Sequence, residues 1–309
     1  MNDSMERLKV SVEALNEALK TKYTNYFHMS DEVFRRDVLS EIGTLSRLQK
    51  LDEASLSSLG ELVGVDGSVV KVGGLYPHYV ELYRGLAKST YNQAVTVNDI
   101  YTPILERDTE ERNRDRMLAK VELDAAIEFL STYSPRIVMM DGGLIRYNIF
   151  DSVHFKRLVN LCREKDVILM GVIKDIKTDL ISSTLGLSHG YDRELLHGRL
   201  QRGEVLYIDN DISRKYKEAD LVSAFLRTGV DSMCIGLDLM AEYEDRLPMM
   251  ANLVYTLTPE HSRGVPLWLD IVDSEVKLTE AMVRSVLETY LDRDIYRRFF
   301  ISERDGRTR

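Results

Sequence analysis

The sequence is poor in cysteine and contains no long apolar run. Only Cys162 and Cys234 occur in 309 residues, far apart and outside any CxxC pair, which argues against a disulfide framework or a cysteine zinc site. No apolar run approaches the roughly 18 residues that span a bilayer. The start, MNDSMERLKV, also lacks the apolar stretch of a signal peptide. We therefore expect a cytoplasmic protein without a membrane span.

Excess basic charge, paired histidines and nucleotide-binding glycine loops are also missing. The formal net charge of -9 argues against a surface that binds nucleic acid by charge alone, but metal-binding carboxylates themselves add negative charge, so a nuclease is not excluded. The six histidines show no HxxxH spacing, and we assign no histidine ligand. Neither G-x-x-x-x-G-K-[ST] nor G-x-G-x-x-G occurs, which removes the two common nucleotide loops.

The first sixty residues are predicted to be helical. Apolar residues of a first helix recur every three or four positions along one narrow seam, which suits packing on the chain's own domain or docking of a partner helix. These positions are Met5, Leu8, Val12, Leu15 and Leu19. A second helix is expected to start at Ser30 and to carry Phe34, Val38, Ile42 and Leu45. We expect residues 1–60 to form a helical extension for dimerisation or partner docking, and residues 61–309 to form the main domain.

From Glu61 onward, short apolar runs with glycine punctuation predict strands. The runs are LVGVDGSVVKVGG, RIVMMDGG, VILMGVIKD, EVLYIDND, NLVYTLTP and VPLWLDIVD. We expect SVVKVGG to return as a hairpin beside LVGVDG, and residues 109–133 and 152–165 to form helices. IVMM and VILMGVI are continuously apolar, as is typical of strands covered on both faces. The residues GLSHGYDRELLHGRLQRGE are expected to leave the sheet. The fold class predicted is α/β, a mixed sheet flanked by helices with an N-terminal helical extension.

Two of these strands end in aspartate followed by glycine. Asp66 and Asp141 therefore stand where ligands collect in α/β sheets, at the carboxyl ends of parallel strands, although a simple turn is the alternative for each. Glu122 falls within the apolar stripe of the helix between them, whereas Asp124 and Glu128 lie on its opposite face. A buried carboxylate needs a partner, which is either a metal ion or an arginine such as Arg116 or Arg136.

Three carboxylates without cysteine or paired histidine suit a hard ion such as Mn²⁺ or Mg²⁺, bound singly or as a pair. Such a site supports phosphoryl transfer or phosphodiester hydrolysis. Lys174 follows the strand GVIKD, where it either holds a phosphate or is a solvated strand-end lysine. If the site needs a fourth acid, we expect Asp270 in the predicted strand VPLWLDIVD to supply it.

Four segments in this order resemble the NurA nuclease family, which has an RNase H-like fold. They are VGVDGS, MLAKVELDAAIEF, IVMMDGGL and GVIKD, and the resemblance is strongest from Glu61 to Lys177. It implies a manganese-dependent exonuclease or endonuclease that acts on single-stranded or duplex DNA ends. It also implies a homodimer that works with a hexameric HerA-type ATPase in DNA end resection and repair. Asp66, Glu122 and Asp141 match the family's metal-binding acids, and Lys174 matches its basic residue.

The C-terminal region departs from the family pattern, which includes a tyrosine and a histidine. Residues 277–300 contain no histidine, and Tyr290 or Tyr296 is a partial substitute. The end of the chain offers a DNA-binding surface in which Tyr296 stacks on bases and Arg297 and Arg298 pair with phosphates; an amphipathic helix with a frayed tail is the alternative. Further arginines follow at Arg304, Arg307 and Arg309.

Two other functions fit part of the pattern. VDGS and MDGG also resemble the phosphate loops of actin-like or sugar-kinase-like ATPases, but no glycine-rich adenosine segment follows Gly264. A catalytically quiet adaptor of the translocase is favoured by the missing histidine and opposed by the three retained acids.

Overall fold

The computed structural model describes residues 2–105, 111–187 and 190–301. Over these residues the chain builds one sheet of nine strands in the order β1-β7-β8-β9-β6-β5-β2-β3-β4. The strands are β1 (Gly43–Arg47), β2 (Leu62–Gly73), β3 (Tyr79–Ser89), β4 (Ala94–Tyr101), β5 (Ile137–Asp141), β6 (Ile168–Ile173), β7 (Glu204–Ile208), β8 (Leu221–Arg227) and β9 (Ile235–Met240).

The centre of the sheet is mixed in direction. Strands β2, β3 and β4 form an antiparallel meander, while β5 runs parallel to β2 and β6 runs parallel to β5. Strands β9, β8, β7 and β1 continue the sheet beyond β6 with antiparallel pairs. The chain therefore has the expected α/β fold class, a mixed sheet flanked by helices. The apolar runs in β5 and β6 are covered on both faces, as predicted.

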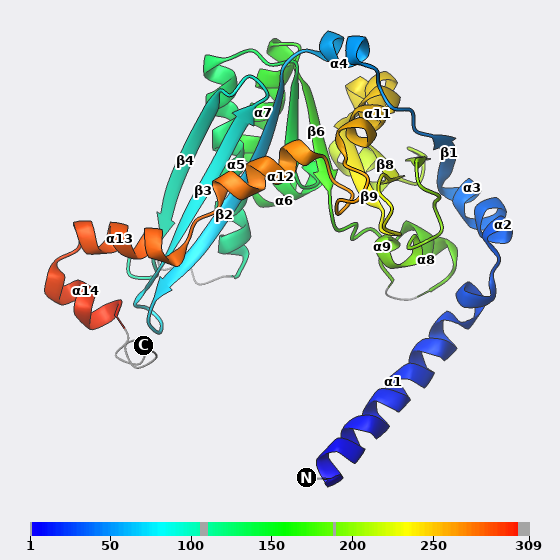
Figure 1. The fold of residues 1–309 in the computed structure, drawn as a ribbon, viewed down its shortest axis with the longest axis horizontal. Coiled ribbons are helices and arrows are strands. Elements are labelled where there is room, and N and C mark those ends of the chain that lie inside the picture. Colours follow the sequence, from blue (N-terminus) through cyan, green and yellow to red (C-terminus); the bar gives the residue numbers. More distant parts are fainter. Residues whose placement is uncertain (1, 106–110, 188–189, 302–309) are drawn as a thin grey trace.

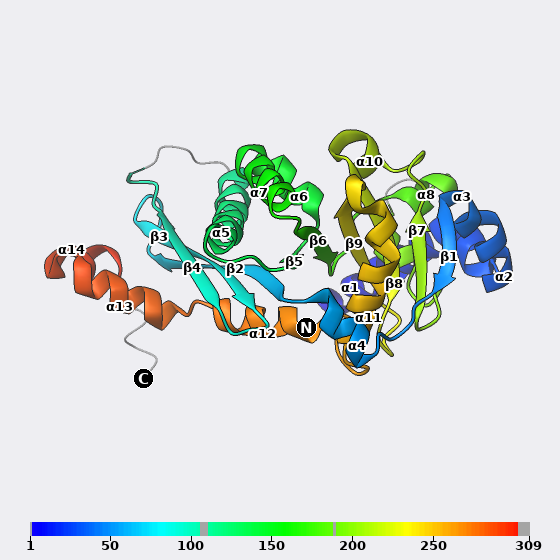
Figure 2. The ribbon, with the colours of Figure 1, turned by 90° about the horizontal axis from the view of Figure 1, so that it is seen from above.

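Helices cover both faces of the sheet (Figures 1 and 2). One face carries α5 (Glu111–Thr132), α6 (Leu144–Phe150), α7 (Ser152–Glu164) and α10 (Arg214–Ala219). The other carries α4 (Glu53–Leu59), α11 (Leu247–Leu257), which follows the 3-10 turn η2 (Ala241–Arg246), and α12 (Leu267–Val276). Helices α8 (Leu180–Thr184) and α9 (Asp192–Leu195) lie outside the sheet between β6 and β7, as expected of this polar segment, whose residues 188–189 lie outside the described residues. The helices α13 (Glu280–Tyr290) and α14 (Arg293–Phe299) pack at the far end of β2 and β3.

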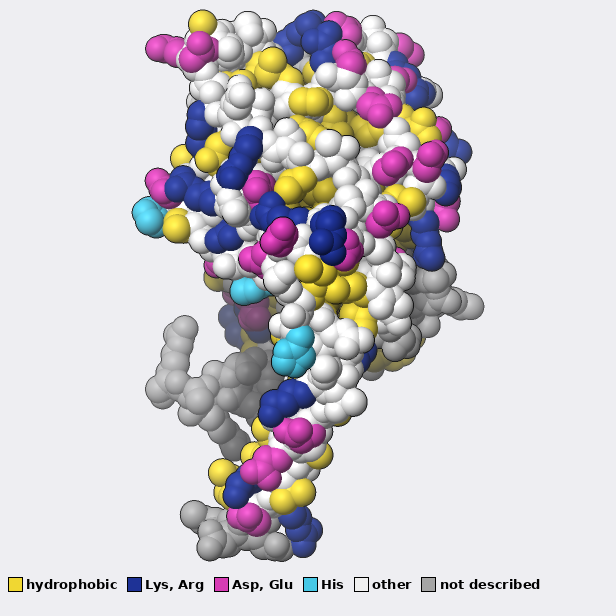
Figure 3. Space-filling model, turned by 90° about the vertical axis from the view of Figure 1, so that its right-hand side faces the viewer, with side chains coloured by type: hydrophobic (Ala, Val, Ile, Leu, Met, Phe, Trp, Pro, Cys, Tyr) yellow, Lys and Arg dark blue, Asp and Glu magenta, His cyan; other side chains and the backbone are white. Residues whose placement is uncertain are grey.

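The N-terminal region begins with α1 (Asn2–His28), which projects away from the body of the protein (Figure 1). The five residues of its predicted apolar seam are all exposed. Figure 3 shows acidic, basic and apolar side chains interspersed along this projecting helix. The helix is anchored only near its end, where the Tyr26 hydroxyl donates a hydrogen bond to the Leu195 carbonyl at 2.9 Å. A docking or dimer role for residues 1–60 stays a prediction.

The second helix starts as predicted, because the Ser30 side chain caps it by accepting a hydrogen bond from the Val33 amide. It continues as α2 (Asp31–Phe34), the π-helical turn η1 (Arg35–Leu39) and α3 (Ser40–Ile42). The expectation of helix throughout residues 1–60 is wrong at 43–47, where β1 pairs with β7. Leu45, placed on the helix by its spacing, therefore lies in a strand at the edge of the sheet.

Three predicted strand assignments are wrong. NLVYTLTP lies largely in α11 and VPLWLDIVD largely in α12. The buried residues of α12 are Leu269, Val272 and Val276, a helical spacing, and short apolar runs do not separate buried helix from buried strand. The expected hairpin inside LVGVDGSVVKVGG is absent because β2 runs unbroken from Leu62 to Gly73, and β3 is the strand that returns beside it.

A pair of glycines lets α5 lie close to the sheet. Gly67 of β2 and Gly85 of β3 stand opposite each other in the antiparallel register. A Cβ atom at Gly85 would lie 2.0 Å from the Val121 carbonyl oxygen of α5, which no side chain allows. The helix backbone therefore rests directly on this strand, and the residue after Val121, Glu122, is carried to the neighbouring strand β2.

We predict that Gly85→Ala will destabilise the protein by about 3 kcal/mol, because α5 or β3 must shift to admit the methyl group. Gly74→Ala is the matched control, since a Cβ there would meet its neighbours at 3.4 Å or more, and it should stay within about 0.5 kcal/mol of wild type. Urea unfolding followed by circular dichroism measures both. Equal free energies of unfolding for the two variants would show that α5 does not depend on this contact.

No helix among residues 2–105, 111–187 and 190–301 has the length and apolar character needed to cross a membrane.

Candidate active site

Asp66 and Asp141 lie on neighbouring parallel strands at the same level of the sheet. Val65 pairs with Met140, so the next residue on each strand is the aspartate. Both side chains belong to the sheet face covered by α12. Gly64, two residues before Asp66, faces Trp268 and Val272 of that helix, and Met139, two residues before Asp141, packs in the same layer. The expected proximity of Asp66 and Asp141 is thus found, but only Asp141 ends its strand, because β2 continues past Asp66 to Gly73.

Glu122 reaches this point from α5 on the other face of the sheet. Its side chain is 1 % exposed, and a Cβ atom at Gly67 would lie 2.6 Å from its Oε1 atom. The glycine directly after Asp66 therefore leaves the space that the Glu122 carboxylate fills. The prediction that Glu122 points inward is confirmed. The glycine of VDGS is explained by the same contact, since a side chain at this position would collide with Glu122.

Two of the three carboxylates have a cationic partner from this chain. Lys174, which follows β6, forms an ion pair with Asp141. Arg146 of α6 donates a hydrogen bond to Glu122 at 3.0 Å. The arginine named from sequence as a partner for Glu122 was Arg116 or Arg136, and Arg136 instead pairs with Asp166. Arg146 was missed because it comes from a different element, α6, five residues after Asp141 at the end of β5.

Asp66 is 7 % exposed and has no ion pair with any residue that the structure describes. Its only hydrogen bond is accepted from the Gly67 amide at 2.7 Å. Burial, together with the charges of Asp141 and Glu122, raises the pKa of Asp66 to about 8. Burial also raises the pKa of Asp141 and of Glu122, against the opposing effects of Lys174 and Arg146. The cluster is therefore short of positive charge at Asp66.

This shortage is what a divalent cation would correct. Over the described residues, no three acidic, histidine or cysteine side chains already stand close enough together to hold one ion. The carboxylate oxygens nevertheless suit Mn²⁺ or Mg²⁺. The charges of Asp141 and Glu122 raise the pKa of Asp66, and the charge of Asp141 also raises the pKa of Glu122. The residues present fit such an ion.

Asp270 lies on helix α12, not on a strand as predicted. Its carboxylate pairs with Arg263 at 2.6 Å. The next acid one turn along the helix is Asp273, and its charge raises the pKa of Asp141. The charge of Lys174 in turn lowers the pKa of Asp273, so Asp273 interacts electrostatically with the cluster. This could not be predicted because the segment was assigned to a strand, in which Asp270 and Asp273 would lie on opposite faces.

Asp238 on β9 is a second fully buried acid that the sequence analysis missed. It accepts hydrogen bonds from Lys215 and from Ser223, both at 2.7 Å, and from the Leu144 amide at 3.2 Å. These bonds tie α10 and the start of α6 to the centre of the sheet. The only signal in the sequence was an aspartate inside the apolar run IGLDLM.

The C-terminal residues proposed to bind DNA lie on α14. Tyr296 is buried between α13, α14 and the end of β2 and β3, so its ring is not available to stack on a base. Arg297 and Arg298 are exposed, and their contact with DNA stays a prediction. The helix packs against Val72, six residues beyond Asp66 and thus roughly 20 Å along the strand. Tyr290 is exposed, whereas Arg304, Arg307 and Arg309 lie outside the described residues.

Several solved nuclease structures have a distantly similar backbone. The catalytic domain of human Endonuclease V matches with a TM-score of 0.45 at 15% identity, over 88% of this chain and 98% of that one. Ciona intestinalis Endonuclease V, in complex with DNA containing an inosine, matches at 0.40 and 14%, over 89% and 99%. Kluyveromyces polysporus Argonaute with a guide RNA matches at 0.36 and 10%, over 74% of this chain and 28% of that one. At these scores the likenesses identify neither a substrate nor a site.

A search of curated proteins finds no match. Among protein-family models, the NurA domain matches residues 60–278. This range includes Lys174 and the acids Asp66, Glu122, Asp141, Asp270 and Asp273. The match covers well over half of the chain and confirms the resemblance seen in the sequence. The chain belongs to the NurA family.

Proposed function

We propose that the chain is a DNA nuclease that hydrolyses phosphodiester bonds with Mn²⁺ or Mg²⁺ at Asp66, Glu122 and Asp141. The observation that carries the proposal is the buried carboxylate of Asp66, which forms no ion pair with any described residue and is close enough to two further acids for their charges to raise its pKa more than the charge of Lys174 lowers it. A protein that needed these residues only for folding would gain nothing from concentrating like charges, because buried unpaired charge is strongly destabilising. Family membership supports the same reaction class.

The roles of the residues follow from their positions. A bound divalent ion lowers the pKa of a water molecule and offsets negative charge on the phosphate. Asp66 would hold it from within β2, Asp141 from the end of β5 and Glu122 from α5. With Asp141 engaged in this way, the Lys174 ammonium would be free to contact a phosphate oxygen and to stabilise charge that develops there. Arg146, which is bonded to Glu122, would do the same on that side of the site.

Asp273 on α12 is proposed to assist from outside the three ligands. It lies next to Lys277 at 3.0 Å and to Arg263 at 3.7 Å, and its charge acts on Asp141. It is the better candidate than Asp270 for a fourth acid, since both acids have cationic partners but Asp273 is the one whose charge acts on Asp141.

The wider role proposed is DNA end resection and repair, as a homodimer working with a hexameric HerA-type ATPase. The exposed apolar seam of α1 offers a surface for either contact. The adaptor without catalysis is the second candidate, favoured by the absence of a histidine from residues 277–300. The family match gives no support to the ATPase alternative.

We expect Asp66→Asn and Asp141→Asn to reduce Mn²⁺-dependent cleavage of linear DNA by about 10²-fold or more, since each removes a charged ligand worth several kcal/mol in the transition state. The matched control is Asp166→Asn on the surface, which should cleave at the wild-type rate. Gel assays of cleavage and calorimetry of Mn²⁺ binding check both. Wild-type protein that cleaves no DNA with Mn²⁺, alone and with the ATPase, would instead support the adaptor.

The stability of the metal-free protein should fall as pH rises from about 4 to about 8. In this range Asp66 stays protonated in the folded state, with its pKa near 8, but is ionised in the unfolded chain, so the folded state binds more protons. Each rise in pH therefore favours unfolding. Melting temperatures in EDTA at pH 5 to 9 test this, and Asp66→Asn should flatten the decline. An unchanged decline in that variant would assign it to other groups.

Asp273→Asn should weaken Mn²⁺ binding about 10- to 100-fold, as is typical when a supporting acid next to a metal site is removed. Asp270→Asn changes a neighbouring acid on the same helix and should leave the affinity near wild type. Calorimetric titration with Mn²⁺ compares the two. The reverse order of effects would make Asp270 the fourth acid.

A further inference from the structure

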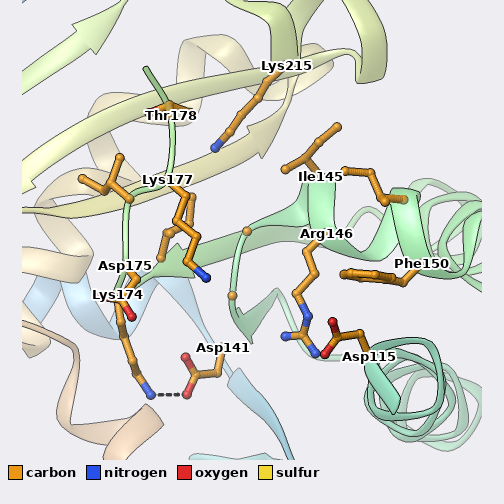
Figure 4. A pocket seen from close by; sticks show the side chains of 15 residues that line it. Asp115, Asp141, Ile145, Arg146, Phe150, Lys174, Asp175, Lys177, Thr178 and Lys215 are labelled. Atoms are coloured by element: carbon orange, nitrogen blue, oxygen red, sulfur yellow. Dashed lines mark hydrogen bonds and ion pairs between the residues drawn. The ribbon is translucent and has the colours of Figure 1, made fainter. Parts of the chain in front are cut away.

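A cleft of about 610 Å³ opens beside Asp141 (Figure 4). It is bounded by α6 on one side and by residues 173–178 at the end of β6 on the other, with Lys215 of α10 closing a third side. The volume falls within the roughly 300–1,000 Å³ typical of pockets for small ligands. Because Asp141 and Lys174 lie in its wall, whatever occupies the cleft is directly adjacent to the proposed reaction centre.

One wall of the cleft is apolar and partly open to water. Ile145, Ile149 and Phe150 of α6 line it, and Ile173 of β6 faces them. Ile149 is 69 % exposed. Aliphatic and aromatic side chains that line a concave surface bind flat apolar groups, and in a nuclease the group available is a nucleobase.

The other walls carry charged side chains of both signs. The lysines and arginine that line the cleft are Arg146, Lys174, Lys177 and Lys215, and the acids are Asp115 beside Arg146, Asp141 and Asp175; Figure 4 shows Lys177 and Arg146 on opposite sides of it. Lys215 is held by the buried Asp238 at 2.7 Å, which fixes its position. Lys177 is exposed and has no hydrogen bond or ion pair with another described residue. The nearby Asp175 forms an ion pair with Arg193 at 3.0 Å and does not neutralise Lys177.

The apolar wall, together with a lysine (Lys177) that has no ion pair with a described residue, fits a molecule that has a flat apolar part and an anionic part, as a nucleotide has. We propose that this cleft binds one unpaired nucleotide of a single-stranded DNA substrate next to the scissile phosphate, with its base on Ile149 and Phe150 and its phosphate on Lys177. A base inside a duplex is stacked and paired on both sides, so it cannot lie against this wall. The inference rests on the proposed function and makes single strands and frayed ends the preferred substrate.

The test compares two variants with two controls by fluorescence anisotropy in EDTA, where no cleavage occurs. The variants are Ile149→Ser and Lys177→Gln, both at exposed positions that should not affect folding. The controls, Val153→Ser and Lys156→Gln, are exposed on the neighbouring helix α7 and lie outside the cleft. The probes are a labelled oligothymidine and a blunt duplex.

Ile149→Ser should weaken binding of the oligothymidine about tenfold, the effect of losing contact with one base, with little change for the duplex. Lys177→Gln should also weaken it, and should reduce the slope of log affinity against log salt by about 0.7, as expected for one lost contact with a single-strand phosphate. Ile149→Ser should leave that slope unchanged. Both controls should bind as wild type.

Unchanged oligothymidine affinity in Ile149→Ser, or equal losses for single strand and duplex, would overturn the inference. If wild type cleaves DNA with Mn²⁺ while Ile149→Ser binds both probes normally, only the cleft assignment fails. If the variants behave as expected but wild type cleaves nothing, the cleft binds single strands and the nuclease proposal fails alone.

Discussion

The concentration of three buried carboxylates around one point of the sheet is the constraint on which the rest of this structure depends. When ionised, Asp66, Glu122 and Asp141 repel one another in a poorly solvated place. Among the described residues, Lys174 pairs with Asp141 and Arg146 with Glu122, while Asp66 has no ion pair. Like charges at such a position are destabilising without further compensation. The fold tolerates them because the sheet is large and its two apolar layers are fully built on either side.

The geometry that brings the three acids together is set by backbone features. Parallel pairing of β2 with β5 places Asp66 beside Asp141, and the facing glycines Gly67 and Gly85 let α5 approach until Glu122 joins them. These features leave strong local traces in the sequence, namely apolar runs followed by Asp-Gly and one acid inside an apolar helical stripe. That is why β2, β5, α5 and the inward direction of Glu122 could be predicted from the sequence, whereas the role of the three acids as metal ligands stays a prediction.

Other parts of the site could not be predicted, for physical reasons that differ. The segment around Asp270 and Asp273 reads equally well as a buried strand or a buried helix, because its apolar run is short, and the choice decides which acid faces Asp141. Asp238 and Arg146 depend on tertiary pairing between elements distant in the chain, which no periodicity encodes. Strand β1 is short, polar and at the edge of the sheet, and it forms only because β7 is there to pair with it.

Lys174 and Arg146 serve two purposes in the proposed function, and together these allow a protein with net negative charge to bind negatively charged DNA. While the acids lack a metal ion, Lys174 and Arg146 neutralise Asp141 and Glu122. In the proposed reaction an ion that binds those acids would take over this task, and both cations would then be free toward the cleft, where Lys177 has no ion pair with a described residue. The positive potential that Lys177 supplies toward a phosphate would thus increase when the ion is bound, so the net charge of -9 does not oppose binding at this point.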